Sequence, residues 1–237
     1  MKKIATIHNP YDEKFGIPRQ SGLANEILST IVFEKEYRVA EALRGIEEFS
    51  HLWLIWAFDR TERETWSPTV RPPRLGGNKR VGVFATRSPF RPNAIGLSCV
   101  RLVAVEKTRE EGTVLKVAGA DLMNGTPIYD IKPYIPYADC HPEATGGFTD
   151  TTRKRTVRVE FAPEAARNLT QEDQHALAAV LREDPRPAYQ DAAEREYAFS
   201  FGGRQIHFRV AGDLLTVHAV GEVREKPSAG PAEEAKI

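Results

Sequence analysis

The chain has 237 residues, of which 41% are hydrophobic and 28% are charged, and its basic and acidic residues balance to a formal net charge of zero. This length corresponds to one large or two small domains, and the composition supports a packed core. No apolar run approaches the ~20 residues that a membrane-spanning helix needs, and the N-terminus lacks the apolar stretch of a signal peptide. The two cysteines, Cys99 and Cys140, do not have the spacing of a metal or redox motif. We therefore expect a cytoplasmic protein without a metal site.

The first half of the chain reads as a series of short strands. Apolar and β-branched patterns predict strands over residues 2–8, 28–33, 49–58, 80–86, 95–105, 113–118 and 126–134. Residues 36–43 instead have Tyr37, Ala40 and Leu43 at helical spacing, followed by Gly45 as a stop signal. The run 49–58 is almost continuously apolar, so we expect a strand that is buried on both faces. Many short strands with few helices predict a mainly β protein whose first domain is an antiparallel β-barrel ending near Tyr137.

The second half begins with a linker and continues as a smaller unit. Residues 139–155 are poor in apolar side chains and contain two glycines, four threonines and a proline, which is typical of a linker. A strand is then predicted over 156–161, a helix over 171–183 with a capping box of Thr170 and Asp173, and three strands over 196–201, 205–210 and 214–220. We therefore predict a barrel domain of residues 1–138, a small α+β domain of residues 156–225 and a flexible tail of residues 226–237.

Positive charge is concentrated in the segment from Arg71 to Ser98. No aspartate or glutamate occurs between Glu64 and Glu106. The basic residues alternate with Gly76, Gly77 and several prolines. The glycines allow backbone conformations that are closed to other residues, and the prolines fix φ. A solvated basic loop is the simplest interpretation. Donors on a stiff backbone also suit a phosphorylated or anionic ligand, and we expect a binding site here.

Four separated motifs resemble one protein family. They are PRQSG (18–22), FSHLWLIWAF (49–58), RPPRLGGNKRVGVFATRSPFRPNAIGLS (71–98) and DLMNGTPIYDIKPYIPY (121–137), and a weaker match, DPRPAY (184–189), extends into the second half. In these motifs the chain resembles the TsaA/TrmO-type family, whose characterised bacterial members are S-adenosylmethionine-dependent tRNA-adenosine methyltransferases. The chain has no glycine-rich dinucleotide fingerprint between a strand and a helix, so a Rossmann methyltransferase is not expected.

The resemblance implies a substrate, an assembly and a cofactor site. The substrate would be the tRNA adenosine just after the anticodon, already carrying a threonylcarbamoyl group, and the assembly a homodimer with the cofactor site near its interface. Arg87 would pair with the methionyl carboxylate of the cofactor, because a guanidinium fork matches a carboxylate; a strand-end arginine paired to a surface acid is the alternative. The residues expected at S-adenosyl-L-methionine are Gln20, Ser21, Gly22, Asp59, Arg60, Arg87, Leu97, Gly125, Thr126, Pro127 and Ile128.

Methyl transfer to an exocyclic amine requires aligned reactants and an acceptor for the proton that nitrogen loses. Three polar residues of the fourth motif, Asp130, Lys132 and Tyr134, are the candidates for the reacting centre. We expect Asp130 to accept the proton. An ordinary ion pair on the barrel surface is the competing interpretation of the same residues.

Two other functions fit the residues. Segment 71–101, with Phe84 and Phe90 among its cations, suits a non-catalytic RNA-binding module. The same cations suit an enzyme acting on a small phosphorylated metabolite. A non-catalytic RNA-binding module would not bind S-adenosylmethionine, so cofactor binding distinguishes it from a methyltransferase. An enzyme acting on a small metabolite would not bind RNA, so RNA affinity distinguishes that function. The residues expected to contact RNA phosphates are Arg71, Arg74, Lys79, Arg80 and Arg91.

Overall fold

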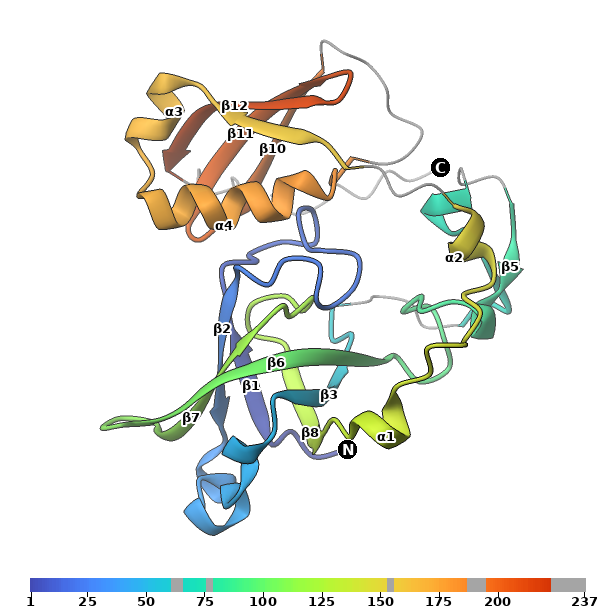
Figure 1. Ribbon diagram of the computed structural model, residues 1–237, viewed down its shortest axis with the longest axis vertical. Helices are drawn as coiled ribbons and strands as arrows, with labels where there is room; N and C mark the ends of the chain where they lie inside the picture. Colours follow the sequence, from blue (N-terminus) through green and yellow to red (C-terminus); the bar gives the residue numbers. More distant parts are fainter. Residues whose placement is uncertain (61–65, 76–78, 153–155, 187–194, 223–237) are drawn as a thin grey trace, which may run out of the picture.

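The computed structural model describes residues 1–60, 66–75, 79–152, 156–186 and 195–222 (Figure 1). The predicted tail, residues 226–237, lies outside these ranges. The first sheet contains the strands β1 (Ala5–His8), β2 (Leu28–Phe33), β3 (His51–Ala57), β6 (Ile95–Thr108), β7 (Gly112–Ala118) and β8 (Pro127–Pro133). They pair in the order β1-β2-β7-β6-β3-β8, and β1 also pairs with β8, so the sheet is a closed barrel. All of these pairings are antiparallel, as the sequence predicted.

Alternation along β3 shows how the barrel is filled. Leu52, Leu54 and Trp56 point inward and are buried, whereas Trp53 and Ile55 on the outer face are half-exposed. The prediction that this strand is buried on both faces is therefore wrong for the single chain. Successive side chains of a strand point to opposite faces, and only one face of a barrel wall meets the core.

The predicted helix over residues 36–43 is replaced by three short 3₁₀ turns, η1 (Lys35–Tyr37), η2 (Ala40–Leu43) and η3 (Ile46–Glu48). Val39 has an extended conformation (φ −102°, ψ 118°) and separates the first two turns. Leu43 is the single buried residue among the three turns. Ala40, a member of the predicted apolar stripe, is exposed, so a helix here would bury little of that stripe. Tertiary packing supplies most of the stability of a short helix.

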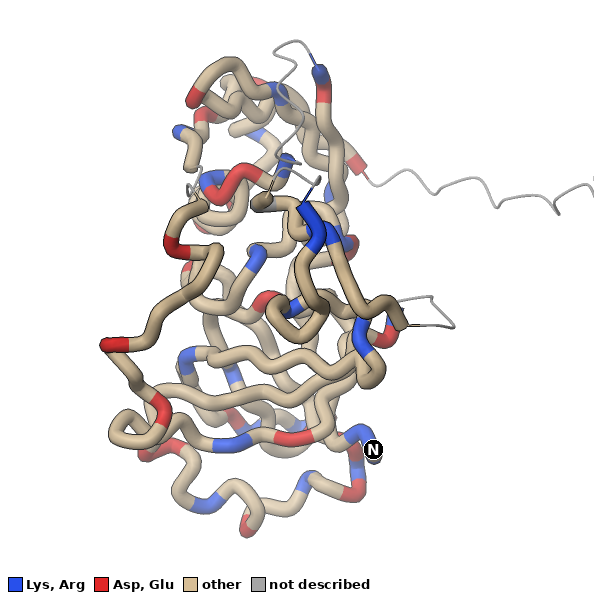
Figure 2. The backbone as a smooth tube through the Cα atoms, turned by 90° about the vertical axis from the view of Figure 1, so that its right-hand side faces the viewer, with Lys and Arg blue, Asp and Glu red and all other residues tan. Residues whose placement is uncertain are grey.

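Residues 66–75 and 79–94 form an arm outside the barrel, which we call the basic arm. It contains the two-residue strands β4 (Thr69–Val70) and β5 (Val81–Gly82) and the turns η4 (Pro73–Leu75) and η5 (Val83–Ala85). The strand predicted over 80–86 is thus reduced to β5, because Val83 turns the chain and buries its side chain. Figure 2 turns this side of the molecule toward the viewer and marks the basic positions in blue.

The second half forms a sheet covered by helices. Its strands are β9 (Arg158–Phe161), β10 (Glu196–Phe201), β11 (Arg204–Ala211) and β12 (Leu214–Glu222), in the order β10-β11-β12-β9. The helices are α3 (Pro163–Arg167) and α4 (Gln171–Arg182), while the short α1 (Pro136–Asp139) and α2 (Phe148–Thr151) lie along the segment between the sheets. Both hydrogen bonds of the predicted capping box of Thr170 and Asp173 are present, at 3.1 and 3.2 Å. None of the helices in the described part of the chain has both the length and the apolar character that a membrane crossing requires.

The loop between β1 and β2, residues 9–27, packs into the core of the second sheet rather than that of the barrel. Tyr11 forms a β-bridge with Phe201, and the ring of Phe15 stacks on Tyr197 and Phe208. In Figure 1 this blue loop lies between the barrel and the upper sheet. The barrel and the second sheet therefore share a segment, which we call the β1–β2 loop.

Candidate functional site

A cavity of about 750 Å³ opens beside the barrel wall, among the β1–β2 loop, the end of β3, the start of β6 and the basic arm. Its lining combines residues from stretches that are far apart in the sequence. Seven of the residues singled out by sequence line it, namely Gln20, Asp59, Arg60, Arg87, Arg91, Leu97 and Thr126. Ligand sites of proteins typically have this size and a small number of placed polar groups.

Arg87 is held in the cavity by the PRQSG motif. Its guanidinium donates a hydrogen bond to the side-chain oxygen of Gln20. The motif is itself fixed to the barrel, because Ser21 Oγ accepts from the backbone N–H of Cys99 (3.2 Å) and the N–H of Gly22 donates to the Gly119 carbonyl (2.8 Å). Ser21 and Gly22 thus support the cavity wall, although neither is among the lining residues.

A second pair of motifs meets on the other side of the cavity. The Arg60 guanidinium donates to the Asn124 carbonyl (3.0 Å), and Lys14 Nζ donates to the Arg60 carbonyl (2.9 Å). These bonds connect the end of β3, the β1–β2 loop and the Asn124-Gly125 turn. Gly125 has φ +82°, a conformation that favours glycine. Arg60 therefore fixes the backbone around which the cavity is built.

Three of the predicted cofactor residues belong to the turn and the following strand rather than to the cavity surface. The Gly125 N–H donates to the Ile7 carbonyl (2.9 Å), and Pro127 begins β8 opposite Thr6. Ile128 is fully buried in the barrel core. Their backbone holds Thr126, which does line the cavity.

A buried polar chain reaches the cavity through Asp121, a residue to which sequence reasoning gave no role. Trp56 Nε1 donates to Ser98 Oγ (2.9 Å), and the Ser98 hydroxyl donates to Asp121 Oδ1. Burial raises the pKa of the Asp121 carboxyl, and the bond from Ser98 and the charge of Arg87 partly oppose that shift. Asp121 opens the quoted fourth motif, but nothing in its spacing connects it with Ser98. Only the packing of the strands reveals this series of hydrogen bonds.

One wall of the cavity is aromatic. The rings of Trp56 and Phe58 lie 4.3 Å apart between centroids, and both residues line the cavity. Gly96 faces the indole so closely that a Cβ atom there would lie 2.2 Å from Trp56 Cε2. The glycine therefore allows Trp56 to lie flat against β6 and to keep its bond to Ser98.

The three candidates for the reacting centre lie away from this cavity. Lys132 and Asp130 form an ion pair with 3.0 Å between Nζ and Oδ2, and both side chains are about half-exposed on β8. Tyr134 packs against Trp53, with 5.8 Å between ring centroids. None of the three is among the residues that line the cavity. Within one chain, the surface ion pair that competed with the catalytic interpretation is the observed arrangement.

The predicted RNA-contacting residues lie in two places. Arg71, Lys79 and Arg80 are exposed on the basic arm, and Arg80 Nε donates to Thr69 Oγ1 (2.8 Å). Arg91 instead lines the cavity, where its guanidinium donates to two carbonyls of its own loop. The side chain of Arg74 lies outside the described part of the structure. Among the described residues, no group of three or more His, Cys, Asp or Glu side chains is placed to hold a metal ion.

The fold and the site together define a β-barrel protein with a small-molecule cavity beside a positively charged surface. Residues 6–140 match the family described as the tRNA-methyltransferase O N-terminal domain, and residues 154–223 match the TrmO C-terminal domain. The chain belongs to the tRNA-methyltransferase O family.

Relatives and solved structures agree with this assignment. The chain is 42% identical to a tRNA (adenine(37)-N6)-methyltransferase of Escherichia coli over 92% of its length and 96% of that protein. It is 35% identical to a Pyrococcus abyssi protein whose name describes S-adenosyl-L-methionine binding, over 79% of its length and 94% of that protein. A crystal structure of TrmO from Pseudomonas aeruginosa superimposes with a TM-score of 0.75 at 34% identity and covers 93% of this chain and 95% of that chain.

Proposed function

We propose that the protein transfers a methyl group from S-adenosyl-L-methionine to the N6 atom of the tRNA adenosine that follows the anticodon, and that this adenosine already carries a threonylcarbamoyl group. The observation that supports the proposal most directly is the composition of the cavity beside the barrel wall. Its lining brings together Gln20, Asp59, Arg87, Leu97 and Thr126, which come from four separated stretches of the part of the chain that matches a tRNA-methyltransferase family. Transfer RNA is a cytoplasmic substrate, so the proposal also places the protein there.

The residues of the cavity fit this cofactor. The Arg87 guanidinium, oriented by Gln20, would hold the methionyl carboxylate. The apolar surface of Trp56, Phe58 and Leu97 would cover the adenosyl part. The half-buried Asp121 carboxylate gives the cavity a negative group that suits a cationic sulfonium. The side chains of the cavity thus match a ligand that has a carboxylate, a flat ring and a positive centre.

The bound cofactor supplies an electrophilic methyl group on a sulfonium that becomes neutral when it leaves. The chain must therefore align the amine with that methyl group, which contributes up to about 7–11 kcal/mol in favourable cases. It must also accept the proton that the amine loses. We assign this role to Asp130, with Lys132 and Tyr134 beside it at the reacting centre.

Asp130 would act from the partner subunit of a homodimer. Strand pairing sets Leu97 beside Ile55, and Ile55 beside Asp130, on the outer face of the barrel. Leu97 is 55% exposed there although it also lines the cavity. The apolar outer face of β3 and β6 is thus continuous with the cavity and open to a second copy. A partner seated on this face would bring its own β8 residues near the cofactor site.

The second sheet with α3 and α4 would serve as a delivery unit for tRNA. We propose that residues 1–138 and 156–225 are two domains joined by the segment 139–155, and that RNA phosphates contact the arm through Arg71, Arg74, Lys79 and Arg80. The separate matches of the two halves to family descriptions support this division.

The deciding experiment is a methyl-transfer assay with labelled cofactor, run on tRNA with and without the threonylcarbamoyl group. Transfer to the modified tRNA alone would support both parts of the proposal. Equal transfer to both would remove the requirement for the prior modification. A folded protein that binds no S-adenosylmethionine by calorimetry would overturn the proposed function.

A further inference from the structure

Two aromatic rings are exposed side by side on the basic arm. Phe84 is 71% exposed and Trp66 is 49% exposed, and their ring centroids lie 6.2 Å apart with an angle of 26° between the planes. Large exposed aromatic surface is unfavourable in water, because each ring loses the free energy that burial would give it. The pair is therefore a candidate contact surface. We call Trp66 and Phe84 the aromatic platform.

The fold of the arm holds the platform in place. Thr69 pairs with Gly82, and the N–H of Val83 continues the ladder by donating to the Pro68 carbonyl (3.0 Å). This ladder brings the strand ends that carry Trp66 and Phe84 together. The buried Val83 side chain, 1% exposed, anchors the same turn. The platform is thus built on a paired backbone with an apolar anchor, while both of its rings remain exposed.

Positive charge is concentrated on the arm that carries the platform. The Arg91 guanidinium lies 6.0 Å from the centroid of the Phe84 ring, and Arg71, Lys79 and Arg80 are exposed on the same arm. No acidic residue occurs in the sequence between Glu64 and Glu106. Among the residues that the structure describes, no carboxylate pairs with any of these four cations. The platform therefore suits a ligand that is flat and anionic.

We propose that the aromatic platform stacks an unpaired base of the RNA substrate, next to the adenosine that enters the cavity. Single-stranded nucleic acid is held by this combination, in which rings stack on bases and nearby cations contact phosphates. Arg91 connects the two places, since it lines the cavity and also lies over Phe84. The inference rests on the proposed function only in taking RNA as the substrate.

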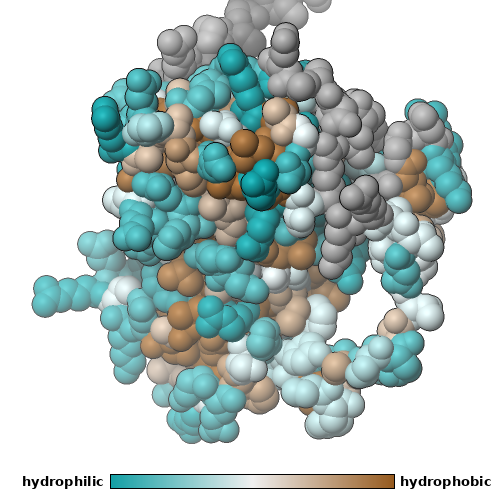
Figure 3. Space-filling view, turned by 45° about the horizontal axis from the view of Figure 1, so that its top comes forward, coloured by the Kyte–Doolittle hydropathy of each residue, from teal (hydrophilic) through white to brown (hydrophobic). Residues whose placement is uncertain are grey.

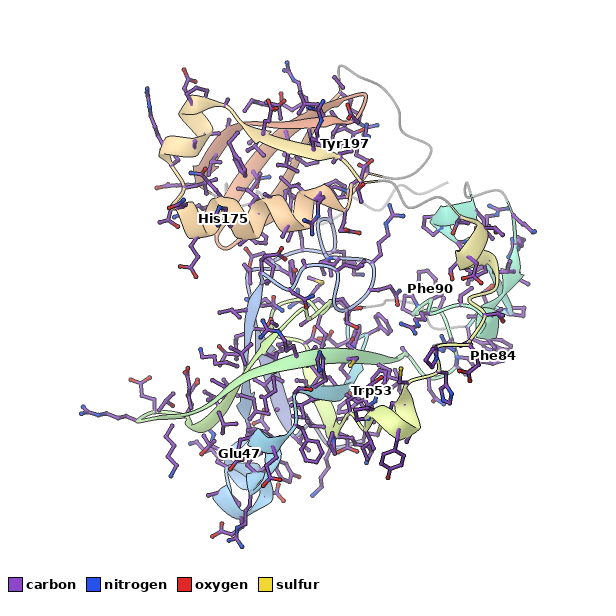
Figure 4. All side chains as sticks on the ribbon, in the orientation of Figure 1. Glu47, Trp53, Phe84, Phe90, His175 and Tyr197 are labelled. Atoms are coloured by element: carbon purple, nitrogen blue, oxygen red, sulfur yellow. The ribbon has the colours of Figure 1, made fainter. Side chains whose placement is uncertain are left out.

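The outer part of the arm is accessible to such a substrate. Figure 3 shows the arm and its neighbourhood as a lobe at the right of the molecule, with an opening between this lobe and the main body. Figure 4 places Phe84 on the outer part of the arm and Phe90 nearer the rest of the molecule. A base on the platform would therefore stay outside the cavity while its neighbour reaches inside.

The test measures RNA binding rather than methylation, so it can be read even if the proposed reaction fails. Trp66→Ala and Phe84→Ala are compared with the wild-type full chain on an RNA hairpin with an anticodon-arm sequence and on a blunt RNA duplex. Each alanine variant should weaken hairpin binding about 5- to 150-fold, the change that corresponds to losing one base–aromatic stack. Duplex binding should change little, because paired bases are not available for stacking.

Three controls make the test specific. Trp66→Phe and Phe84→Tyr keep a ring and should keep hairpin affinity. Tyr137→Ala removes an aromatic side chain that is 91% exposed on α1, outside the arm, and should have no effect. The dependence of binding on salt should have the same slope in Trp66→Ala as in the wild type, since stacking releases no counterions.

Three results would overturn the proposal. Equal weakening on hairpin and duplex would mean that the rings do not stack on bases. If Tyr137→Ala weakened hairpin binding equally, any exposed aromatic ring would contribute to RNA binding, and the platform would have no special role. A change of oligomeric state in the Trp66→Ala and Phe84→Ala double variant, measured by sedimentation, would assign the platform to a contact between copies of the chain. If the alanine variants unfold, fluorescence still decides, because RNA should quench wild-type emission more than that of Trp66→Phe.

Discussion

Single residues set the electrostatics of the cavity. Arg87 and Asp121 carry opposite charges inside it, and each is held by a side chain from another element, Gln20 and Ser98 respectively. The cost of keeping the Asp121 carboxylate there is visible in its raised pKa. Charged groups that are desolvated without full compensation are typical of functional sites, where binding takes precedence over stability.

The first prediction follows from the raised pKa of Asp121. A carboxyl whose pKa is higher in the folded than in the unfolded state makes unfolding easier as pH rises through its range, because the folded state releases its proton less readily. Asp121→Asn removes this charge and keeps an acceptor for the Ser98 hydroxyl. We expect a higher melting temperature than the wild type at neutral pH. The difference should shrink as pH falls through the raised pKa of Asp121 and should vanish below about pH 4, the ordinary range of an aspartate carboxyl. Cofactor affinity should fall at the same time.

Thermal denaturation between pH 3.5 and 7.5 and calorimetry with S-adenosylmethionine measure the two effects. Asp130→Asn is the matched control, since the Asp130 side chain is about half-exposed and forms an ion pair with Lys132 on the surface. A melting temperature of Asp121→Asn that lies below that of the wild type at neutral pH would show that the carboxylate stabilises the fold.

A second prediction concerns Arg87. Arg87→Ala should weaken cofactor binding about 10- to 100-fold, the loss expected for a charged hydrogen-bonded contact. RNA affinity should stay nearly unchanged, because the side chain lies in the cavity and not on the exposed part of the arm. Calorimetry and RNA-binding titrations measure the two affinities, and Arg109→Ala, an exposed arginine in the β6–β7 turn, is the control. Normal cofactor affinity in Arg87→Ala would mean that another group holds the carboxylate.

Much of the site was predictable residue by residue because its motifs are contiguous in the sequence. PRQSG and the basic segment were both recognised, and the cavity contains members of each. Asp121, Ser98 and Trp56 were not assigned, because their hydrogen-bonded chain joins three elements and leaves no periodic signal. Asp130 and Lys132 lie on one strand as predicted, whereas Tyr134 follows directly after the end of β8. A sequence cannot show that their side chains lie away from the cavity.

At the scale of elements, the strands were easier to predict than the turns. Residues 28–33 form β2 as predicted, and α4 begins after its predicted capping box. The alternation of apolar and polar residues along a strand and the capping residues of a helix are local signals, so a single sequence is enough to recognise them. The helix over 36–43 and the strand over 80–86 failed, because burial decided those segments and burial depends on what packs against them. The basic arm is therefore an element that only the structure defines.

The third prediction tests the close contact between β3 and β6. Gly96→Ala would place a methyl group 2.2 Å from Trp56 Cε2, and the buried indole has little room to move. Overpacking of this kind costs typically about 1–3 kcal/mol. We expect a lower melting temperature together with weaker cofactor binding, because Trp56 lines the cavity. Gly82→Ala is the control, since nothing lies within 4 Å of a Cβ atom there. An unchanged Gly96→Ala protein would mean that the strands separate easily.

The fourth prediction belongs to the basic arm. If Arg71, Lys79 and Arg80 contact phosphates, then neutralising each one to glutamine should flatten the dependence of log affinity on log salt by about 0.7–0.9. Binding titrations with tRNA over a range of potassium chloride concentrations measure the slope. Arg109→Gln changes the net charge equally and should leave the slope as it is. Slopes that fall equally in all four variants would indicate a general charge effect rather than contacts.

At the scale of the whole molecule, the β1–β2 loop connects the cavity with the second sheet. Its Tyr11 and Phe15 pack in that sheet's core, while Gln20 lines the cavity. The predicted domain bounds assign this loop to the barrel, although its aromatic side chains pack in the second sheet. Arg19 adds a further link, since its guanidinium donates to the Arg186 carbonyl (3.1 Å). The linker composition marks a boundary in the sequence, but the packing crosses it.

The fifth prediction is therefore about truncation. A chain that ends at Phe148 would leave Tyr11, Phe15 and Ile17 without their partners, and the PRQSG segment would lose one of its supports. We expect the truncated protein to lose most of its cofactor affinity as well as tRNA methylation. Calorimetry and circular dichroism measure binding and folding. A folded truncate with normal cofactor affinity would show that the contacts of the motif with the barrel, through Ser21 and Gly22, are sufficient.

Gly16 offers a test of the same link in the full chain. It has φ +90°, and a Cβ atom there would lie 2.5 Å from the ring of Phe199. Gly16→Ala should loosen the loop from the second sheet and weaken cofactor binding, although Gly16 is not among the residues that line the cavity. Gly203→Ala, which also has positive φ but no atom within 4 Å of its Cβ, separates backbone strain from the contact.

The shared loop also has a consequence for the order of biosynthesis. Tyr11 leaves the ribosome early, yet its bridge partner Phe201 is added 190 residues later. At about 5–20 residues per second, the loop waits roughly 10–40 s for the strands that cover it. During translation all strands of the barrel are synthesised before the strands of the second sheet, against which the loop packs. The nascent chain should therefore acquire a folded barrel first and a competent cofactor cavity only when synthesis is nearly complete.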